Sequence, residues 1–191
     1  MMQRLVIITV GKTHSGKTTF AKALEQQLHN SLVIDQDNHA EFINTYYQAL
    51  LPKQGPNTIK YAITQTIVDY AVHQTNLHLI LCNSNRARQG RLDLIAHFRN
   101  QGFISILVHF DLPDHVLQAR VASSQRSTAI FRGASTFNEV FIRQQVESHH
   151  DGVIEPVERE ADHLFVIQNA DDVLSVTQAI IHIAKSLGSS G

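Results

Sequence analysis

Five short apolar runs along the chain alternate with longer segments in which apolar residues recur at helical spacing. The runs cover residues 4–10, 31–35, 77–82, 103–110 and 163–167. Most of them are continuously apolar rather than alternating, which is the pattern of strands covered on both faces. Because such strands occur in parallel sheets flanked by helices, the pattern predicts a doubly wound α/β domain.

Helical spacing fills most of the sequence between these runs. The clearest helical segments are residues 17–29, 88–100, 113–123 and 172–187. Two connections are longer than the others. Residues 36–76 hold two predicted helices around a turn, and residues 124–162 hold an arginine-bearing segment and a further helix. We find no internal repeat, so the pattern indicates one continuous domain.

Composition places the chain among ordinary globular proteins. It has 191 residues, of which 43% are hydrophobic and 17% charged, and this suits a single domain with a full core. The formal net charge of −1 gives no overall basic field that would attract nucleic acid or an anionic membrane. We expect one domain over residues 1–187 and a flexible tail over residues 188–191.

Neither membrane insertion nor disulfide chemistry is expected. No apolar run approaches the roughly 20 residues of a membrane span, and the first run stops at Gly11, too early for a signal peptide. Cys82 is the single cysteine, and its apolar surroundings favour a small buried side chain over a reactive thiol. These features lead us to expect a cytoplasmic protein.

The most specific motif is GKTHSGKT, which directly follows the first apolar run and opens the first predicted helix. Glycines in such a loop let the backbone approach a ligand closely, and its successive N–H groups and the helix N-terminus attract phosphate. This setting of strand, glycine loop and helix predicts a nucleoside triphosphate site with Mg²⁺. The predicted nucleotide-binding residues are Gly11, Lys12, Thr13, His14, Ser15, Gly16, Lys17, Thr18 and Thr19.

Individual roles follow from side-chain chemistry. Lys17 is expected to reach the β- and γ-phosphates, and the Thr18 hydroxyl to ligate Mg²⁺. Thr19 is a weaker candidate for an α-phosphate contact, and His14 is expected to be a spacer. The alternative for Lys17 and Thr18 is that both are merely solvated beside a glycine turn.

Several classes of nucleotide-binding protein do not fit the remaining sequence. A GTPase normally has Asn-Lys-x-Asp and Asp-x-x-Gly motifs, but Asn169-Ala170-Asp171-Asp172 lacks the lysine and no Asp-x-x-Gly occurs. Larger ring or transporter ATPases have a strand that ends in acidic pairs, whereas the third run leads into Asn83. A kinase of a small molecule or nucleotide remains.

The second predicted strand ends in Asp35-Gln36-Asp37, at the edge of the sheet where open α/β folds bind ligands. Here the chain resembles the small P-loop kinases grouped around polynucleotide, gluconate and shikimate kinases, and the AAA_33 and zeta-toxin-type proteins. The resemblance implies a three-layer P-loop NTPase fold, and we expect a five-stranded parallel sheet in the order 2-3-1-4-5. It also implies that Asp35 helps to hold Mg²⁺ and that Asp37 orients or deprotonates the acceptor. The alternative is that Asp35 caps the end of the strand and Asp37 caps the next helix.

The resemblance extends into FDLPDHVLQARVASSQRS and implies an arginine-bearing lid over ATP, within residues 120–150. Arg120 and Arg126 occupy the places of the lid arginines, and Arg132 and Arg143 lie further along. Guanidinium groups suit this task because they stay charged and fork onto phosphate oxygens. The predicted catalytic residues are therefore Lys17, Asp37, Arg120 and Arg126. A solvated basic helix face is the alternative for the two arginines.

The acceptor side is expected to include the helices of residues 36–76 and the cluster that follows the third strand. That cluster contains Asn83, Asn85, Arg86, Arg88 and Arg91, and we expect it at the rim of the acceptor site. The apolar group after Asp37 is expected to be mostly core, and the alternative is that one or two members line the acceptor site. Its members are Phe42, Tyr46, Tyr47, Leu50 and Leu51.

Three further features concern adenine binding, metal binding and the choice of acceptor. Asn169 and its acidic neighbours lie near adenine or cap the last helix. The tightest histidine cluster, His149-His150-Asp151, is expected at the surface, because adjacent helical residues point about 100° apart and do not share a metal. Ala40 stands where polynucleotide kinases usually carry an arginine, which weakens the case for a nucleic-acid substrate.

The sequence thus predicts an ATP- and Mg²⁺-dependent kinase acting on a hydroxyl of a small molecule, sugar or nucleoside, as a monomer or homodimer. Two alternatives stay open. One is an ATP-binding or ATP-hydrolysing module that transfers no phosphate, which the departures at Asn83 and Ala40 would fit. The other is toxin- or resistance-type phosphorylation of a nucleotide sugar or antibiotic.

Overall fold

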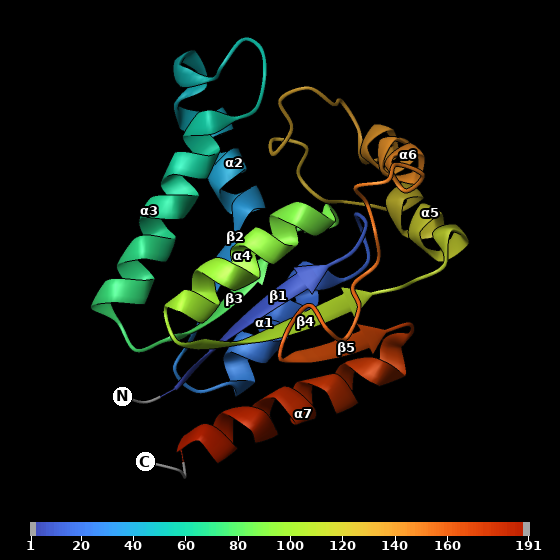
Figure 1. The fold of residues 1–191 in the computed structure, drawn as a ribbon. Helices are drawn as coiled ribbons and strands as arrows, with labels where there is room; N and C mark the ends of the chain where they lie inside the picture. Colours follow the sequence, from blue (N-terminus) through green and yellow to red (C-terminus); the bar gives the residue numbers. More distant parts are fainter. Residues whose placement is uncertain (1–2, 189–191) are drawn as a thin grey trace.

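The computed structural model describes residues 3–188 and shows one parallel sheet with helices on both faces (Figure 1). The strands are β1 (Arg4–Val10), β2 (Ser31–Asp35), β3 (His78–Cys82), β4 (Phe103–Phe110) and β5 (His163–Ile167). Their order is β2-β3-β1-β4-β5, and every pairing is parallel. The predicted α/β class and the order 2-3-1-4-5 are confirmed.

The helices lie close to their predicted positions. They are α1 (Lys17–Gln27), α2 (Gln36–Tyr46), α3 (Thr58–Gln74), α4 (Arg88–Asn100), α5 (Asp114–Ala122), α6 (Phe137–Glu147) and α7 (Ala170–Gly188), with a 3₁₀ turn η1 (Gln48–Leu50) after α2. Gly188 belongs to α7 rather than to the predicted flexible tail. The other residues of that tail, 189–191, lie outside the described residues.

β1 is the central strand, and its burial explains the first apolar run. It pairs with β3 on one side and with β4 on the other. Leu5, Val6, Ile7 and Ile8 are all 0% exposed, because helices cover both faces of the strand. Burying each such side chain stabilises the fold by about 1.5–3 kcal/mol. The strand that leads into the glycine loop is therefore firmly anchored.

Two hydrophobic cores lie on opposite faces of the sheet. On one face, α1 and α7 pack against the strands through Phe20, Leu24 and Ile180. On the other, α3 and α4 pack through Val72 and Phe98. This division is the three-layer arrangement that the continuous apolar strands predict.

The segment of residues 114–147 contains α5 and α6 and forms a small core of its own. Leu117 and Val121 of α5 pack against Phe137 and Phe141 of α6. Figure 1 shows this segment beyond the carboxyl ends of the strands, at the same end of the sheet as the β1–α1 loop. We call it the α5–α6 segment below.

The apolar group that follows Asp37 is not core, so that prediction is wrong. α2 buries Ala40 and Ile43, and its other face points outward. Phe42, Tyr46, Tyr47 and Leu50 are between 45% and 72% exposed, and Leu51 is half-buried. The cause is topological, because α2 and η1 extend beyond the sheet and do not lie across it (Figure 1).

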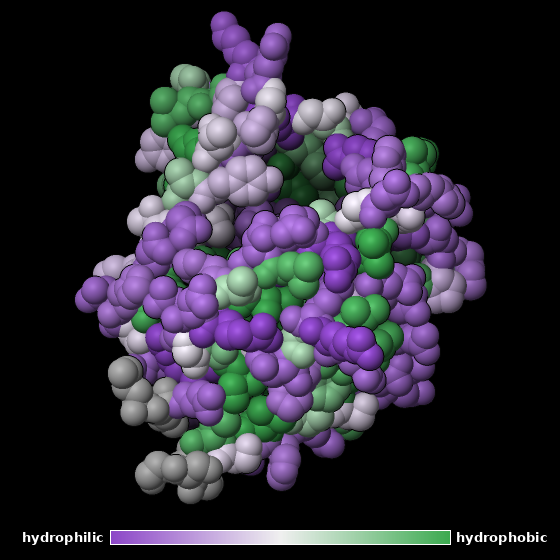
Figure 2. All heavy atoms as spheres, in the orientation of Figure 1, coloured by the Kyte–Doolittle hydropathy of each residue, from purple (hydrophilic) through white to green (hydrophobic). Residues whose placement is uncertain are grey.

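Hydrophilic side chains cover most of the face shown in Figure 2. The upper part of this face is hollowed between the α2–α3 side and the α5–α6 segment, with apolar residues at the bottom of the hollow. Within residues 3–188, no helix combines the length and the apolar character needed to cross a membrane.

A buried ion pair joins α4 to the segment that precedes β5. The Arg91 and Glu160 side chains are 0% and 1% exposed, and Nε of Arg91 lies 2.7 Å from Oε2 of Glu160. Arg91 also donates to the carbonyl oxygens of Asn85, Arg86 and Ile154. Removing one partner of such a pair leaves a buried charge without compensation.

We therefore expect Glu160→Ala to lower the free energy of unfolding by about 3–5 kcal/mol. Chemical denaturation followed by circular dichroism measures this change. Glu158→Ala is the matched control, because Glu158 is exposed in the same segment, and it should change stability by about 0.5 kcal/mol or less. Equal stabilities for the two variants would contradict the structural role of the pair.

Candidate active site

The loop between β1 and α1 has glycines at two positions that disfavour any other residue, Gly11 for lack of space and Gly16 for its backbone conformation. At Gly11, a Cβ atom would lie 3.0 Å from both Cβ and the carbonyl oxygen of Phe110, so the loop can pack against β4 only without a side chain. Gly16 caps α1 in the left-handed region with φ 101°, which other residues rarely adopt. Both glycines of the motif are thus required by the geometry.

Most backbone amides of the loop remain available for a ligand. The Gly11 amide donates to the Ser84 carbonyl at 2.9 Å, and the Thr13 amide donates to Oε1 of Gln144 at 2.7 Å. For the amides of residues 14–16, the described part of the chain supplies no hydrogen-bond acceptor. Successive amides at the start of a helix form an anion-binding concavity.

Lys17 lies inside this loop and bonds to the loop itself. Its Nζ donates to the Lys12 carbonyl at 2.5 Å and to Oγ of Ser15 at 3.2 Å. Burial lowers the pKa of the Lys17 ammonium to about 8, although Cys82 and Asp37 act in the opposite direction. A multiply charged anion beside Nζ would favour the protonated form and raise this pKa again.

Asp35 at the end of β2 connects α1, α2 and the sheet. Its Oδ2 accepts from the Thr18 hydroxyl at 3.2 Å, and its Oδ1 accepts from the Asp37 amide at 2.9 Å, which caps α2. The Thr18 hydroxyl also lies 3.5 Å from Sγ of Cys82. Asp35, and not Asp37, therefore caps the helix, and its carboxylate also reaches the predicted metal-binding hydroxyl.

Cys82 is a buried side chain, as predicted, although it also lines the cavity described below. Burial and the nearby Asp35 raise the pKa of the thiol to about 11. A thiol with this pKa stays protonated at neutral pH, so the environment does not favour a nucleophilic role.

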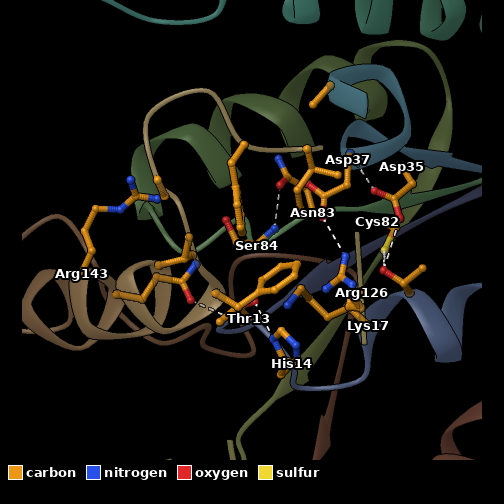
Figure 3. A pocket seen from close by; sticks show the side chains of 18 of the residues that line it. Thr13, His14, Lys17, Asp35, Asp37, Cys82, Asn83, Ser84, Arg126 and Arg143 are labelled. Atoms are coloured by element: carbon orange, nitrogen blue, oxygen red, sulfur yellow. Dashed lines mark hydrogen bonds and ion pairs between the residues drawn. The ribbon is translucent and has the colours of Figure 1, made fainter. Parts of the chain in front are cut away.

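Asp37 forms an ion pair with Arg126, as Figure 3 shows. The distance from its Oδ2 to Nη2 of Arg126 is 3.2 Å, and both side chains are partly exposed. The Arg126 guanidinium also lies over the Phe137 ring, 5.0 Å from its centroid. The pair joins the start of α2 to the connection between α5 and α6, two segments that are far apart in sequence.

His14 links the loop to the α5–α6 segment and is more than a spacer. Its Nε2 lies 2.8 Å from Oγ of Ser124, and its ring meets the Phe137 ring edge-on with 4.7 Å between centroids. Burial, together with Arg126, Lys17 and Arg120, lowers the pKa of His14 to about 4. The imidazole is consequently neutral at physiological pH.

Further contacts dock the α5–α6 segment onto the loop. Nζ of Lys12 pairs with Oδ1 of Asp114 at 2.5 Å, and Nη1 of Arg120 donates to the His14 carbonyl at 3.2 Å. Burial alone would raise the pKa of Asp114, but hydrogen bonds from Lys12 and Gln145 outweigh it and lower that pKa. The segment is thus held by side chains on both of its helices.

These groups surround a cavity of about 770 Å³. Of the predicted site residues, it is lined by Thr13, His14, Gly16, Lys17, Thr18, Thr19, Asp35, Asp37, Arg120 and Arg126. Gly11 and Lys12 line a second, smaller cavity of about 180 Å³ on the other side of the loop, and Ser15 is buried beneath it. The structure therefore brings the loop, the two carboxylates and the two arginines to one space.

The cavity also includes residues that sequence reasoning missed. They are Asn57 before α3, Lys60 of α3, Ile130, Phe131, Gly133 and Ala134 of the connection between α5 and α6, and Phe137, Val140 and Gln144 of α6. Arg132 and Arg143, which the sequence placed further along the lid, line the cavity as well. Asn57 caps α3 by accepting from the Lys60 amide, so the Pro-Asn-Thr sequence signalled a helix start. No local pattern marks Gln144, whose role arises from the docking of α6 on the loop.

The arginine cluster after β3 does not form an acceptor rim, and that prediction is wrong. Arg91 is buried against Glu160, Arg88 pairs with the same carboxylate, and Arg86 donates to the Gln144 carbonyl and Ser148. Of this cluster, Asn83 lines the cavity, and Asn85 donates to the Thr9 carbonyl. The three arginines instead fix α4, α6 and the chain before β5.

Asn169, predicted either to lie near adenine or to cap the last helix, has the capping role. The Asn169 side chain accepts from the amides of Asp171 and Asp172, so it caps α7.

Among the described residues, no group of three or more histidine, cysteine and acidic side chains could hold a metal ion. The Thr18 hydroxyl and the Asp35 carboxylate supply hard oxygen atoms, which fit a single Mg²⁺ that keeps several waters.

Comparison with solved structures shows the same fold over almost the full chain. One similar structure is Kti12 of Chaetomium thermophilum in complex with ADP-AlF3, with 16% identity, a TM-score of 0.61, and coverage of 92% of this chain and 96% of that chain. Another is the APS kinase CysC of Mycobacterium tuberculosis in complex with AMPPNP and APS, with 13% identity, a TM-score of 0.58, and coverage of 97% and 99%. Shikimate kinase of Bacteroides thetaiotaomicron has 17% identity, a TM-score of 0.56, and coverage of 95% and 98%.

At these identities the likeness establishes the fold alone, which is the P-loop NTPase fold. The search of curated protein sequences found no match. A family model for the AAA_33 AAA domain matches residues 6–147, a range that runs from β1 to the end of α6. The match spans most of the chain and contains the glycine loop, both carboxylates and both arginines, and the chain therefore belongs to the AAA_33 family.

Proposed function

We propose that this protein is a Mg²⁺-ATP-dependent phosphotransferase that acts on a hydroxyl group of a small molecule. One observation carries the proposal. The phosphate-binding loop with Lys17, the carboxylate of Asp37 and the guanidinium groups of Arg120 and Arg126 line the same cavity. A kinase needs a triphosphate site and an acceptor-orienting carboxylate in one enclosed space, since phosphoryl transfer depends mainly on positioning and charge neutralisation.

The triphosphate is proposed to bind along the loop. The amides of residues 14–16 and the start of α1 provide the donors, and Lys17 provides the charge for the β- and γ-phosphates. Thr18 and Asp35 would hold Mg²⁺. When bound, this ion neutralises charge on the phosphate oxygens.

In the proposed transfer, Asp37 positions the acceptor hydroxyl and accepts its proton. The hydroxyl oxygen forms a bond to the γ-phosphorus while the bond from that phosphorus to the β–γ bridging oxygen breaks. The products are the phosphorylated acceptor and ADP, and the proton resides on the Asp37 carboxylate until it exchanges with solvent. Arg120 and Arg126 stabilise the negative charge on the transferred group.

The α5–α6 segment is the proposed lid. Its contacts use groups that we also assign to ligand binding: Gln144 accepts from the Thr13 amide of the loop, and Arg126 pairs with Asp37 of α2. Nucleotide binding must therefore exchange these contacts for contacts with phosphate. Such an exchange couples the docking of the lid to occupation of the site.

A second candidate function is ATP binding or hydrolysis without transfer to an acceptor. The feature that favours it is Asn83, an amide where the corresponding strand of many ATPases ends in a carboxylate. Its Nδ2 donates to Oε1 of Gln36 at 3.0 Å, so it bonds to protein at the edge of the cavity. Acceptor labelling separates the two candidates.

The first test removes the proposed phosphate-binding charge. Lys17→Ala should weaken ATP binding about 10- to 100-fold, the effect of losing a charged hydrogen bond worth about 1.5–3 kcal/mol. Isothermal titration calorimetry measures the affinity. Lys22→Ala is the control, because Lys22 is exposed on the same helix. An unchanged affinity in a folded Lys17→Ala variant would count against the loop as the triphosphate site.

The second test removes the proposed acceptor base. Asp37→Asn should reduce transfer from γ-labelled ATP to an acceptor about 10²- to 10⁴-fold while ATP still binds. A screen of hydroxyl-bearing compounds first identifies an acceptor for the wild type, and Glu41→Gln on the same helix is the control. If a labelled acceptor is phosphorylated by Asp37→Asn at the wild-type rate, the assignment of Asp37 is wrong. If ATP binds and no acceptor is ever labelled, the second candidate function gains support.

The lowered pKa of Lys17 predicts proton uptake on nucleotide binding. With a pKa of about 8, Lys17 is about half neutral at pH 8. Bound phosphate raises this pKa and so favours the protonated form. Nucleotide binding should therefore take up about half a proton at pH 8 and much less at pH 7. Calorimetry in buffers of different ionisation enthalpy measures the uptake. Lys17→Arg keeps its charge and should abolish the pH dependence. Equal uptake at both pH values in the wild type would refute this coupling.

A further inference from the structure

Cationic side chains line the part of the cavity that lies away from the β1–α1 loop. Lys60 from α3 and Arg132 from the chain between α5 and α6 both line it, together with Asn57 and residues 130–134. Asp37, the proposed acceptor carboxylate, lies in the same cavity and already pairs with Arg126. The acceptor side therefore has more positive than negative charge.

Lys60 has no carboxylate partner within ion-pair distance among residues 3–188. Its side chain is half-buried, and its Nζ lies 4.8 Å from the centroid of the Tyr61 ring. Burial lowers the pKa of Lys60; Asp37 opposes this shift and Arg132 adds to it. A half-buried ammonium that faces a second cation is costly unless an anion joins them.

Local structure fixes both cations in place. The amide of Lys60 donates to Oδ1 of Asn57 at 3.2 Å, so Lys60 lies in the first turn of a capped helix. Arg132 donates to the carbonyl oxygens of Pro52, at 3.1 Å, and of Gly55. Since a guanidinium has five N–H donors, these two bonds position Arg132 and leave other donors for a ligand.

The charges near Lys60 differ from those near the phosphate-binding loop. The pKa of Lys17 responds to Asp35, Asp37 and Arg126, whereas the pKa of Lys60 responds to Asp37 and Arg132. Asp37 is the charge common to both surroundings. Asp37, Lys17, Lys60 and Arg132 all line the same cavity.

We propose that Lys60 and Arg132 form an oxyanion-binding subsite, and that the acceptor carries a phosphate, sulfate or carboxylate group besides the hydroxyl that Asp37 orients. This inference rests on the proposed function and narrows its substrate class to anionic hydroxyl compounds. Lys60 supplies a point charge and Arg132 a planar fork, the two usual ways in which proteins bind oxyanions. A neutral sugar or nucleoside would leave both charges without a counter-ion.

The direct test measures anion binding without turnover. The protein is first saturated with Mg²⁺ and a non-hydrolysable ATP analogue, which occupies the phosphate-binding loop. Inorganic phosphate, sulfate and acetate are then titrated separately, and binding is followed by NMR chemical shifts of the residues that line the acceptor side. The three probes distinguish which oxyanion the subsite prefers.

We expect at least one of these anions to bind, and Lys60→Met to weaken that binding about tenfold or more. Methionine keeps the apolar stem of the lysine, so the fold should be retained. Lys53→Met is the matched control, because Lys53 is exposed in the segment directly before α3. Absence of binding by all three anions, or equal binding by both variants, would overturn the inference. A loss of affinity for the ATP analogue in Lys60→Met would assign this charge to the nucleotide and would also overturn it.

Turnover with matched acceptors separates this inference from the proposed function. Each pair consists of a neutral hydroxyl compound and an anionic analogue of it: glucose and glucose 6-phosphate, adenosine and AMP, glycerol and glycerate. Labelling that favours the anionic member, with a KM raised by Lys60→Met, supports the inference. Equal labelling of the neutral members would overturn it and leave the phosphotransferase proposal standing. Anion binding without transfer to any acceptor would instead support the oxyanion-binding subsite and contradict the proposed phosphotransferase function.

Discussion

Every other feature of the site depends on the path of the chain between β1 and α1. The backbone amides of this loop must converge on one point, and only a few contacts make that path stable. β1 is buried at the centre of the sheet, Gly11 packs directly against Phe110, and Gly16 adopts a left-handed conformation at the start of α1. Together these constraints present the N-terminus of α1 to the cavity, where amide dipoles favour a multiply charged anion.

Polar groups around this loop are already bonded to one another. Lys17 donates to a loop carbonyl, Arg126 pairs with Asp37, and the Thr13 amide donates to Gln144. In each of these contacts, a group that we assign to phosphate or acceptor binding is bonded to protein atoms. The α5–α6 segment therefore competes with the ligand for the same donors, and its docking is the natural control point for binding. The cationic residues of the proposed oxyanion-binding subsite line the same cavity.

Sequence patterns predicted the parts of this structure that are locally encoded. Continuous apolar strands report burial on both faces, so the five strands and their class followed directly, and the glycine motif identified the loop because its setting is specific. The interactions between distant segments were not predictable. Arg91 looked like an acceptor residue, because nothing near it in sequence announces the buried Glu160 that neutralises it. Lys60 was overlooked, because only the tertiary fold brings α3 to the cavity. Phe42 and its neighbours looked like core, because helical spacing does not reveal that α2 extends beyond the sheet.

The central claim is that the loop amides and Lys17 bind a triphosphate beside Asp37. A crystal structure of the protein with Mg²⁺ and a non-hydrolysable ATP analogue tests it most directly. The account predicts the β- and γ-phosphates within hydrogen-bond distance of the amides of residues 14–16 and of Nζ of Lys17, with Gln144 displaced from the Thr13 amide. A nucleotide bound elsewhere, with Lys17 still bonded to the Lys12 carbonyl and Gln144 still in place, would contradict it.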